Sequence, residues 1–258
     1  DGAMSKTLHT ANATLCGLRA AELAALGFTA ARDILAGGHG LLGAMTPDNH
    51  PEVLTRELDW ASCALLTNSL KPYACCRHTH SADYCAELLR KEHHLEPEHI
   101  TRIVDHTYQV AVNTVDDPAP ATPYGYKFSG QYCTAAMLVY GNLQESVFTP
   151  EATSAPEVRR LMEKITLVCD PELEASYQAD RNRWAHRLEV TMDDGRVLTK
   201  QVEYPYGDFN NPFSWDFEHQ KFHTLADGVL GRERADELVR RTPRLDELDD
   251  INELFQGL

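Results

Sequence analysis

The sequence predicts an α+β protein in which helical segments at both ends flank a mixed central part. Apolar residues recur every three or four positions before residue 70 and after residue 217, which is the spacing of one helix face. They alternate with polar residues in 100–113 and 188–204, which is typical of strands. The chain has 258 residues, 43% of them apolar, so it can form one large domain or two smaller ones.

The first 70 residues are expected to form three helices. The first covers residues 12–26, where Gly27 suits the end of a helix. Thr29 can cap a second helix, which would contain Ile34 and Leu35. A third helix is predicted over 51–70, because Pro51 fits a first turn and an apolar stripe follows at helical spacing, formed by Val53, Leu54, Leu58, Ala61 and Leu65.

The central part mixes both patterns. A helix is predicted over 80–91, a strand over 100–113, a proline-rich loop over 116–125 and a helix over 128–141. Ser154 and Glu157 have the spacing of a capping box, which predicts that another helix follows.

A hairpin and a helical C-terminal part complete the prediction. Asp194 and Gly195 stand between two alternating runs, 188–192 and 197–204, and this pair is the strongest short hairpin signal. After a loop over 204–215, Phe222, Leu225 and Val229 share one helix face, so residues 217–258 are expected to be helical.

Charge and cysteine content limit the classes of function. The formal net charge of −15 argues against nucleic acid and against an anionic membrane as partners. Any anion site must then be built from locally gathered Lys, Arg or His.

The seven cysteines are odd in number and lack a Cys-x-x-Cys pair, which indicates free thiols in a reducing compartment and therefore the cytoplasm. Neither a signal peptide nor a bilayer-length apolar run is recognisable.

Residues 69–85 gather a lysine, an arginine, two histidines and three cysteines in one short segment. A zinc site is disfavoured, because Cys75 and Cys76 are adjacent and His78 and His80 have no suitably spaced partner pair. Thiol redox chemistry is disfavoured without Cys-x-x-Cys. The segment is best interpreted as an anion-binding corner, with no metal and no other cofactor.

Four stretches resemble the MmgE/PrpD family, which includes 2-methylcitrate dehydratases, iminodisuccinate epimerases and cis-aconitate decarboxylases. In chain order they are SKTLHTANATLCGLRAAELAALGFTA, KPYACCRHTHSAD, KFSGQYCTAAMLVYG and YPYGDFNNPFSWDFEHQKF. Each is weak alone, but together they are fairly specific and extend over nearly the whole chain.

The resemblance implies a helical domain with a smaller α+β lid domain inserted in it. The boundaries would be 1–70 for the first helical part, 71–208 for the lid and 209–258 for the returning helices. The chain matches about the second half of a family member, so upstream helices that carry pocket residues are expected elsewhere. We therefore expect a fragment or a natural subunit, and either a homodimer or a partner chain that supplies those helices.

The resemblance also assigns substrate-binding roles to Lys6 and Lys71, and Arg77 is a third candidate because a guanidinium can bind a carboxylate through two hydrogen bonds. Ammonium and guanidinium groups suit carboxylates, and Lys6 would lie at a helix N-terminus, where anions bind well. The alternatives are a solvated lysine for Lys6, a surface hinge lysine for Lys71 and an ordinary ion pair for Arg77. His9 is a weaker neighbouring candidate.

Catalytic roles fall on His80, Tyr132 and Lys71 by the same resemblance. His80 would shuttle a proton or orient substrate, and Tyr132 would donate or accept one. The alternatives are a hydrogen-bonded structural histidine and a core aromatic residue. Decarboxylase-type members carry a histidine where Cys76 stands, which counts against cis-aconitate decarboxylation.

The expected activity is that of a cofactor-independent lyase or isomerase acting on a small di- or tricarboxylate. The favoured reaction is dehydration or hydration of a 2-methylcitrate-like acid, by removal of a proton next to a carboxylate. An epimerase of an imino or amino diacid is one alternative, and a non-catalytic partner subunit is another.

Overall fold

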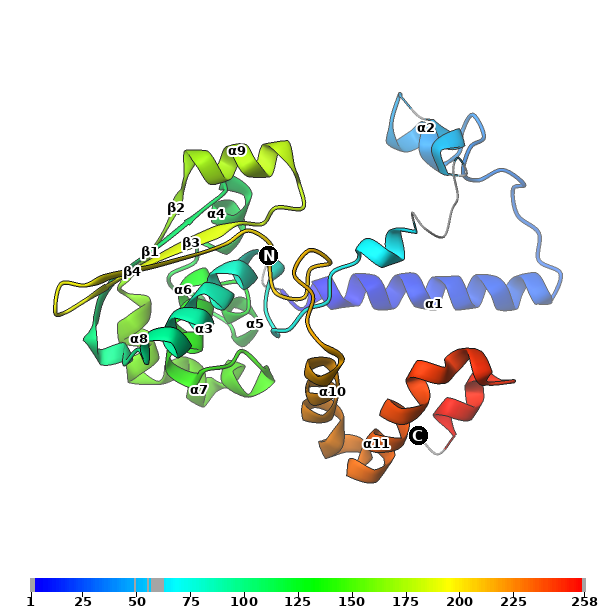
Figure 1. Ribbon diagram of the computed structural model, residues 1–258. Coiled ribbons are helices and arrows are strands. Elements are labelled where there is room, and N and C mark those ends of the chain that lie inside the picture. Colours follow the sequence, from blue (N-terminus) through cyan, green and yellow to red (C-terminus); the bar gives the residue numbers. More distant parts are fainter. Residues whose placement is uncertain (1–2, 49, 55, 57–62, 257–258) are drawn as a thin grey trace.

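The computed structural model describes residues 3–48, 50–54, 56 and 63–256. Helices come first, a mixed helix-and-strand part follows, and helices return at the end, which confirms the predicted α+β class (Figure 1). We call residues 71–208 the sheet region, and residues 3–70 and 209–256 the outer helical segments. No helix in the described part of the chain is long and apolar enough to cross a membrane.

One four-stranded sheet, in the order β2-β1-β3-β4, organises the sheet region. Strand β1 (Ile100–Thr107) pairs in parallel with β2 (Ile165–Cys169) and antiparallel with β3 (His186–Met192). Strand β4 (Val197–Val202) pairs with β3 as the predicted hairpin. Gly195 has a φ of +87° in the turn, a conformation that glycine adopts without strain.

Two helices at the centre of the sheet region confirm their predictions. Helix α3 (His80–His93) contacts β3 and β4, and helix α6 (Gly130–Tyr140) packs against α3 and α8 (Pro156–Met162). Helix α6 begins at Ser129, whose side chain accepts a hydrogen bond from the Tyr132 amide, and it ends at Gly141 with a φ of +73°. Its residues from Gly130 to Leu138 are all buried, so α6 is the centre of the core.

Two predictions in this region were wrong in detail. The strand predicted over 100–113 ends at Thr107, and residues Gln109–Val115 form helix α4. Ala111 and Val115 are four residues apart, so a helix buries both on one face, and this packing outweighs the alternating pattern. Ser154 does not cap α8: it ends α7 (Pro150–Ser154), and its hydroxyl donates to the carbonyl of Pro150.

Shorter elements complete the sheet region. Helix α9 (Pro171–Ala179) follows β2, and Asp170 caps it by accepting hydrogen bonds from the amides of Glu172 and Leu173. The remaining elements are η4 (Arg77–Thr79), η5 (Pro97–His99), α5 (Pro123–Tyr126) and η6 (Glu145–Phe148).

The first outer helical segment is less regular than predicted. Helix α1 (Ser5–Ala25) confirms the first prediction, but residues 29–40 form turns, and the next helix is α2 (Leu41–Met45). The helix predicted over 51–70 lies partly outside the described residues. Its described parts form only η1 (Pro51–Leu54) and η3 (Ala64–Thr67). Helices gain most of their stability from packing, and all of α1, for example, is exposed.

The C-terminal outer segment is helical, as predicted. It contains α10 (Trp215–Leu230), α11 (Arg232–Arg241), η7 (Thr242–Glu247) and η8 (Ile251–Phe255). Leu225 and Val229 of the predicted apolar face are 52% and 83% exposed. An apolar groove of about 420 Å³ lies between these elements, with Phe222, Leu238 and Leu254 in its lining.

Candidate functional site

Two lysines and one histidine gather where α1 meets the sheet region. Lys6 lies in the first turn of α1, with its ammonium 5.1 Å from the ring centre of Phe128. Lys71 opens the sheet region and donates a hydrogen bond of 2.9 Å to the carbonyl of Cys75. Lys71 is exposed at the surface, but the surrounding protein partly desolvates its ammonium and so lowers its pKa, and the positive charges of Lys6 and Arg77 also act to lower it. His78 lies close enough to feel both lysine charges. We call Lys6, Lys71 and His78 the lysine cluster.

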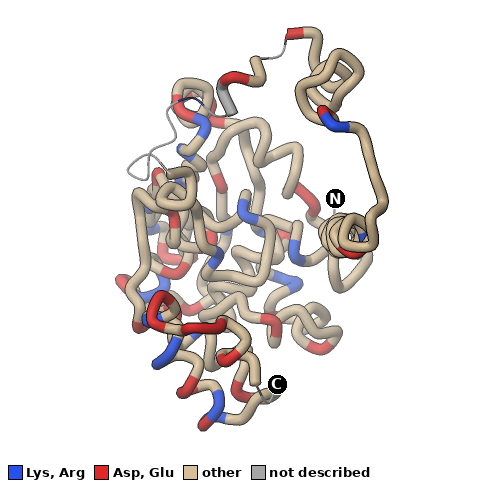
Figure 2. The backbone as a smooth tube through the Cα atoms, turned by 90° about the vertical axis from the view of Figure 1, so that its right-hand side faces the viewer, with Lys and Arg blue, Asp and Glu red and all other residues tan. Residues whose placement is uncertain are grey.

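The two lysines of the lysine cluster differ from most other lysines in their partners. Four of the seven lysines pair with a glutamate within 3.1 Å. Across the described ranges, neither Lys6 nor Lys71 has a carboxylate partner, although acidic residues are spread over the whole molecule (Figure 2). In a chain with a net charge of −15, two lysines that feel each other's charge and lack a carboxylate partner among the described residues can attract an anion.

Arg77 is engaged in holding the fold together. Its guanidinium donates to the carbonyl of Leu70 at 3.0 Å and lies 3.5 Å from the carboxylate of Asp208. Ser69 donates to the same carboxylate at 2.6 Å, so both ends of the sheet region are joined here. The side chain of Arg77 is only 11% exposed. The structure therefore favours the ion-pair alternative over a free substrate clamp for this residue.

His80 and Tyr132 lie in the core, away from the solvent-exposed lysines. His80 is fully buried, with Nε2 3.4 Å from the carbonyl of Cys75. Tyr132 is also fully buried, and its hydroxyl donates to the carbonyl of Val147. Burial raises the pKa of Tyr132, which disfavours proton removal from its phenol. Both side chains lie in the first turns of α3 and α6, which bury them, so neither reaches the solvent beside the lysines.

His78 is the residue that the sequence prediction passed over. It is half-buried, its Nδ1 lies 2.7 Å from the hydroxyl of Tyr108, and its ring stacks on Trp184 with centroids 4.5 Å apart. The spacing of the two histidines in the sequence did not distinguish His78 from His80. Only the packing of α3 shows which of the two faces outward.

Two groups of described residues have the spacing to hold a metal ion. The first, Cys75, Asp83 and Cys133, is buried, with ligand atoms within 4.8 Å of one another. Its members also bond within the protein, since the Asp83 carboxylate accepts a hydrogen bond of 2.7 Å from Thr79. The second group, Glu96, Glu98 and His99, is exposed. Neither group includes a member of the lysine cluster.

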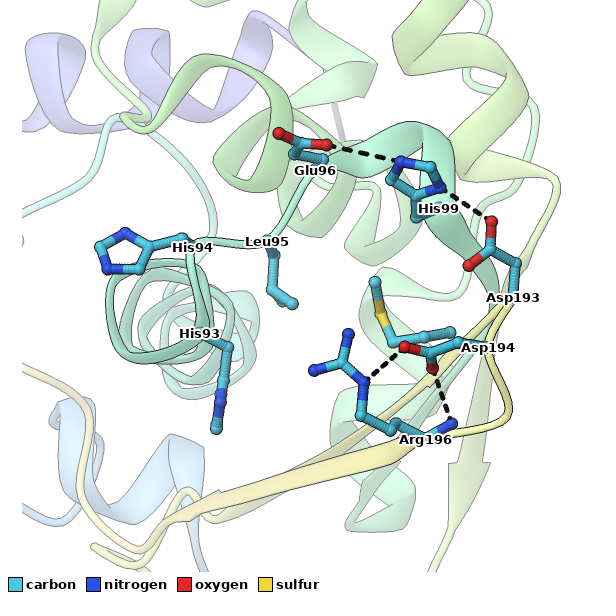
Figure 3. Close-up of a pocket in the computed structure, with 9 residues that line it drawn as sticks. His93, His94, Leu95, Glu96, His99, Asp193, Asp194 and Arg196 are labelled. Atoms are coloured by element: carbon cyan, nitrogen blue, oxygen red, sulfur yellow. Dashed lines mark hydrogen bonds and ion pairs between the residues drawn. The ribbon is translucent and has the colours of Figure 1, made fainter.

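A polar pocket of about 280 Å³ lies at the other end of α3 (Figure 3). His93 and His94, at the C-terminal end of α3, line it. His99 lies 2.8 Å from Asp193, and Arg196 lies 2.6 Å from Asp194, so these charges are already paired. Helix α3 has 14 residues, which places this pocket about 20 Å from the lysine cluster. The pocket therefore offers no unpaired cation for a carboxylate.

Comparisons with known proteins agree with this architecture. Residues 73–244 match the MmgE/PrpD C-terminal domain. Cis-aconitate decarboxylase from Mus musculus is 28% identical over 262 residues, which cover 98% of this chain and 52% of that protein. The Homo sapiens protein of the same name is 27% identical, with coverage of 97% and 52%. The mitochondrial 2-methylcitrate dehydratase of Yarrowia lipolytica is 32% identical over 111 residues, which cover 42% of this chain and 21% of that protein.

The chain spans about half the length of the curated relatives that it matches over nearly all of its own residues. The family match covers well over half of the chain and includes the whole sheet, α3, α6 and most of the C-terminal helices. This chain therefore belongs to the MmgE/PrpD family and corresponds to the C-terminal half of its relatives.

Proposed function

We propose that this chain supplies the carboxylate-binding part of a cofactor-independent lyase site for a small di- or tricarboxylate. The observation that carries the proposal is the pair Lys6 and Lys71, two neighbouring ammonium groups without acidic partners among the described residues. The names of the relatives, cis-aconitate decarboxylase and 2-methylcitrate dehydratase, both refer to tricarboxylic acids.

The chemistry explains why such an acid needs fixed cations. Removing a proton from the carbon next to a carboxylate pushes negative charge onto the carboxylate oxygens. Ammonium groups held at those oxygens stabilise that charge without having to reorganise during the reaction. Lys71 is held by its hydrogen bond to Cys75, and Lys6 by the backbone of α1 and the ring of Phe128.

Among the possible reactions we favour dehydration or hydration of a 2-methylcitrate-like acid. Cys76, which is buried beside Lys71, stands where the resemblance assigns a histidine to decarboxylases. Decarboxylation is the second candidate, because the relatives matched over nearly the whole chain carry that name. Epimerisation of an imino or amino diacid remains the isomerase alternative, since it needs the same proton removal.

Binding of citrate to lysine variants tests the proposal. Each of the two exposed lysines should contribute to the free energy of citrate binding. The contribution should lie between the roughly 0.5 kcal/mol of a surface ion pair and the roughly 3 kcal/mol of a hydrogen bond to a charged group. Lys6→Ala and Lys71→Ala should each weaken citrate binding about tenfold, or about 1.4 kcal/mol, in calorimetry at low ionic strength.

The matched control is Lys91→Ala, because Lys91 already pairs with Glu87 at 2.5 Å on α3. We expect its citrate affinity to equal that of the wild-type chain. Equal affinities in all three variants, or no saturable citrate binding by the wild-type chain, would contradict the proposed site.

We further propose that the sheet region acts as a lid domain and that other helices cover the outer helical segments. Leu8, Leu15 and Leu18 of α1 are 65%, 45% and 62% exposed, and patches of this kind mark interaction surfaces. Helices outside these 258 residues, on a partner chain or elsewhere in a longer protein, are the favoured cover. A second copy of this chain is the alternative.

The seven free thiols support a reducing compartment such as the cytoplasm.

Sedimentation over a wide concentration range tests this proposal. The purified chain should associate, and the double variant Leu8→Lys with Leu18→Lys should lower its average mass. The control is Thr10→Lys, which lies about 200° around the helix from Leu8. A wild-type chain that stays at the 28.9 kDa of a monomer at every concentration would exclude a cover formed by a second copy.

A further inference from the structure

We propose that His78 is the residue that takes the proton from the substrate, and that Tyr108 and Trp184 position it for this task. The inference rests on the proposed function and adds to it the proton-transfer group, which neither His80 nor Tyr132 can supply from the core. Nδ1 of His78 faces Tyr108, while Nε2 has no partner in the described part of the chain. Unlike Nδ1 of His80, Nε2 of His78 is not a buried unpaired atom.

The imidazole ring is held from two directions. Its face stacks on Trp184 with planes only 5° apart, and its Nδ1 lies 2.7 Å from the Tyr108 hydroxyl. Trp184 is itself fixed, because its indole N–H donates to the carbonyl of Arg181 at 2.8 Å and its own carbonyl accepts from Ser81 at 2.6 Å. A ring fixed in this way holds Nε2 in one direction, which efficient proton transfer requires.

Tyr108 is an equally rigid anchor. It is fully buried, stacks on Tyr177 at 4.3 Å and meets the ring of His186 edge-on at 6.0 Å. Burial raises the pKa of Tyr108, so its phenol stays neutral. A neutral phenol oxygen can accept a hydrogen bond from Nδ1–H, and this tautomer leaves the lone pair of Nε2 free to act as a base.

The charges around His78 suit a base that is neutral before substrate binds. Burial lowers the pKa of His78 to about 4, and the charges of His186, Lys6 and Lys71 contribute to that decrease. Substrate carboxylates bound to Lys6 and Lys71 would neutralise two of these charges. The pKa of His78 should then rise on binding, toward the range in which an imidazole is an effective base.

The proposed step is balanced in atoms and electrons. The C–H bond next to the substrate carboxylate breaks, and its proton forms a bond with Nε2 of His78. The electron pair moves toward the carboxylate held by the lysines and then forms the carbon–carbon double bond as hydroxide departs. The imidazolium returns the proton to the hydroxide, which leaves as water, so no oxidant, reductant or metal takes part.

Deuterium exchange into citrate tests the proposal, because the methylene protons of citrate lie next to carboxylates. His78→Asn keeps an amide group near Nδ1 but removes Nε2. We expect it to slow the exchange at least a hundredfold, the range of general base catalysis, while citrate affinity stays within about threefold of wild type. Tyr108→Phe removes only the anchor of Nδ1 and should slow exchange about tenfold. His93→Asn, at the exposed end of α3, is the matched control and should behave as wild type.

Histidine NMR titration provides a readout that a purely structural role would not affect. The His78 resonance should titrate well below 6.5 in the free chain, and its midpoint should rise when citrate is added. Three results would each overturn the proposal. They are an exchange rate in His78→Asn equal to that of wild type, a loss of citrate affinity as large as the loss of exchange, and a His78 titration midpoint that does not move when citrate is added. If the wild-type chain binds citrate but does not exchange the methylene protons of citrate, only the role of His78 is overturned. A chain that binds no citrate overturns the proposed function and this role with it.

Discussion

The sheet region and the outer helical segments differ in what surrounds their apolar side chains. The buried hydrophobic cluster is drawn entirely from residues 73–202, and α6 at its centre is buried over nine consecutive residues. Helix α1 is longer than α6, yet every one of its residues is exposed (Figure 1). The sheet region therefore contains its own core, whereas the apolar side chains of α1 are exposed.

This difference explains why the lysine cluster lies where it does. Lys71 and His78 are carried by the well-packed sheet region, while Lys6 is carried by α1. A cover packed on α1 would therefore also fix the position of Lys6 relative to Lys71. Under the proposed function, completing the helical part would also complete the anion site.

The largest expected effect comes from the core of the sheet region. Leu188 on β3 is fully buried, so Leu188→Ala should lower the free energy of unfolding by about 2–5 kcal/mol through lost burial and the cavity left behind. Urea unfolding followed by circular dichroism measures this change.

Leu18→Ala is the matched substitution on α1. Leu18 is 62% exposed, so the change in unfolding free energy should stay within about 0.5 kcal/mol. A loss as large as that of Leu188→Ala would show that α1 packs in solution and would remove the contrast between the two regions.

A smaller effect on stability should come from helix capping, which also differs between the two regions. Asp170 caps α9 through the amides of Glu172 and Leu173, whereas Met4 provides no side-chain cap for α1. Asp170→Ala should cost about 1 kcal/mol at neutral pH, and the same unfolding assay checks it.

The contribution of Asp170 should also depend on pH. Burial acts to raise the pKa of this carboxyl, but the amides of Leu173 and Glu172 and the guanidinium of Arg187 outweigh it, so the pKa is lowered. A lowered pKa in the folded state means that the stabilisation is complete above the unfolded value of about 3.9 and is lost as the pH falls through the folded value. A difference between wild type and Asp170→Ala that is the same at neutral pH and below the folded pKa would contradict this account.

Local sequence signals predicted an element correctly where the tertiary packing of that segment favours the same secondary structure. The hairpin around Gly195 and helices α3 and α6 appear where spacing, turn residues and stop signals coincide. The prediction failed where packing opposed a local pattern, as in α4, where burial of Ala111 and Val115 replaced the end of a strand. It also failed over 29–40, where nearly all residues are exposed and little burial is available to stabilise the expected helix.

The candidate site shows the same division. Lys6 and Lys71 were predicted from the sequence as substrate-binding residues, and in the structure the charge of Lys6 acts on Lys71. The sequence did not distinguish His78 from His80 or show that Asp208 engages Arg77, because both depend on contacts between distant parts of the chain.

The sequence by itself determined the α+β class, the order of helices and hairpin, the family and the cationic character of residues 69–85. These features follow from periodicity, turn chemistry and residue type, which act over a few neighbouring positions. Only the tertiary structure decided that His80 and Tyr132 are buried while His78 is half-buried and feels the charges of the lysines. Burial and hydrogen-bond partners are set by the packing of α3, α6 and the sheet, and elements far apart in the chain create that packing together.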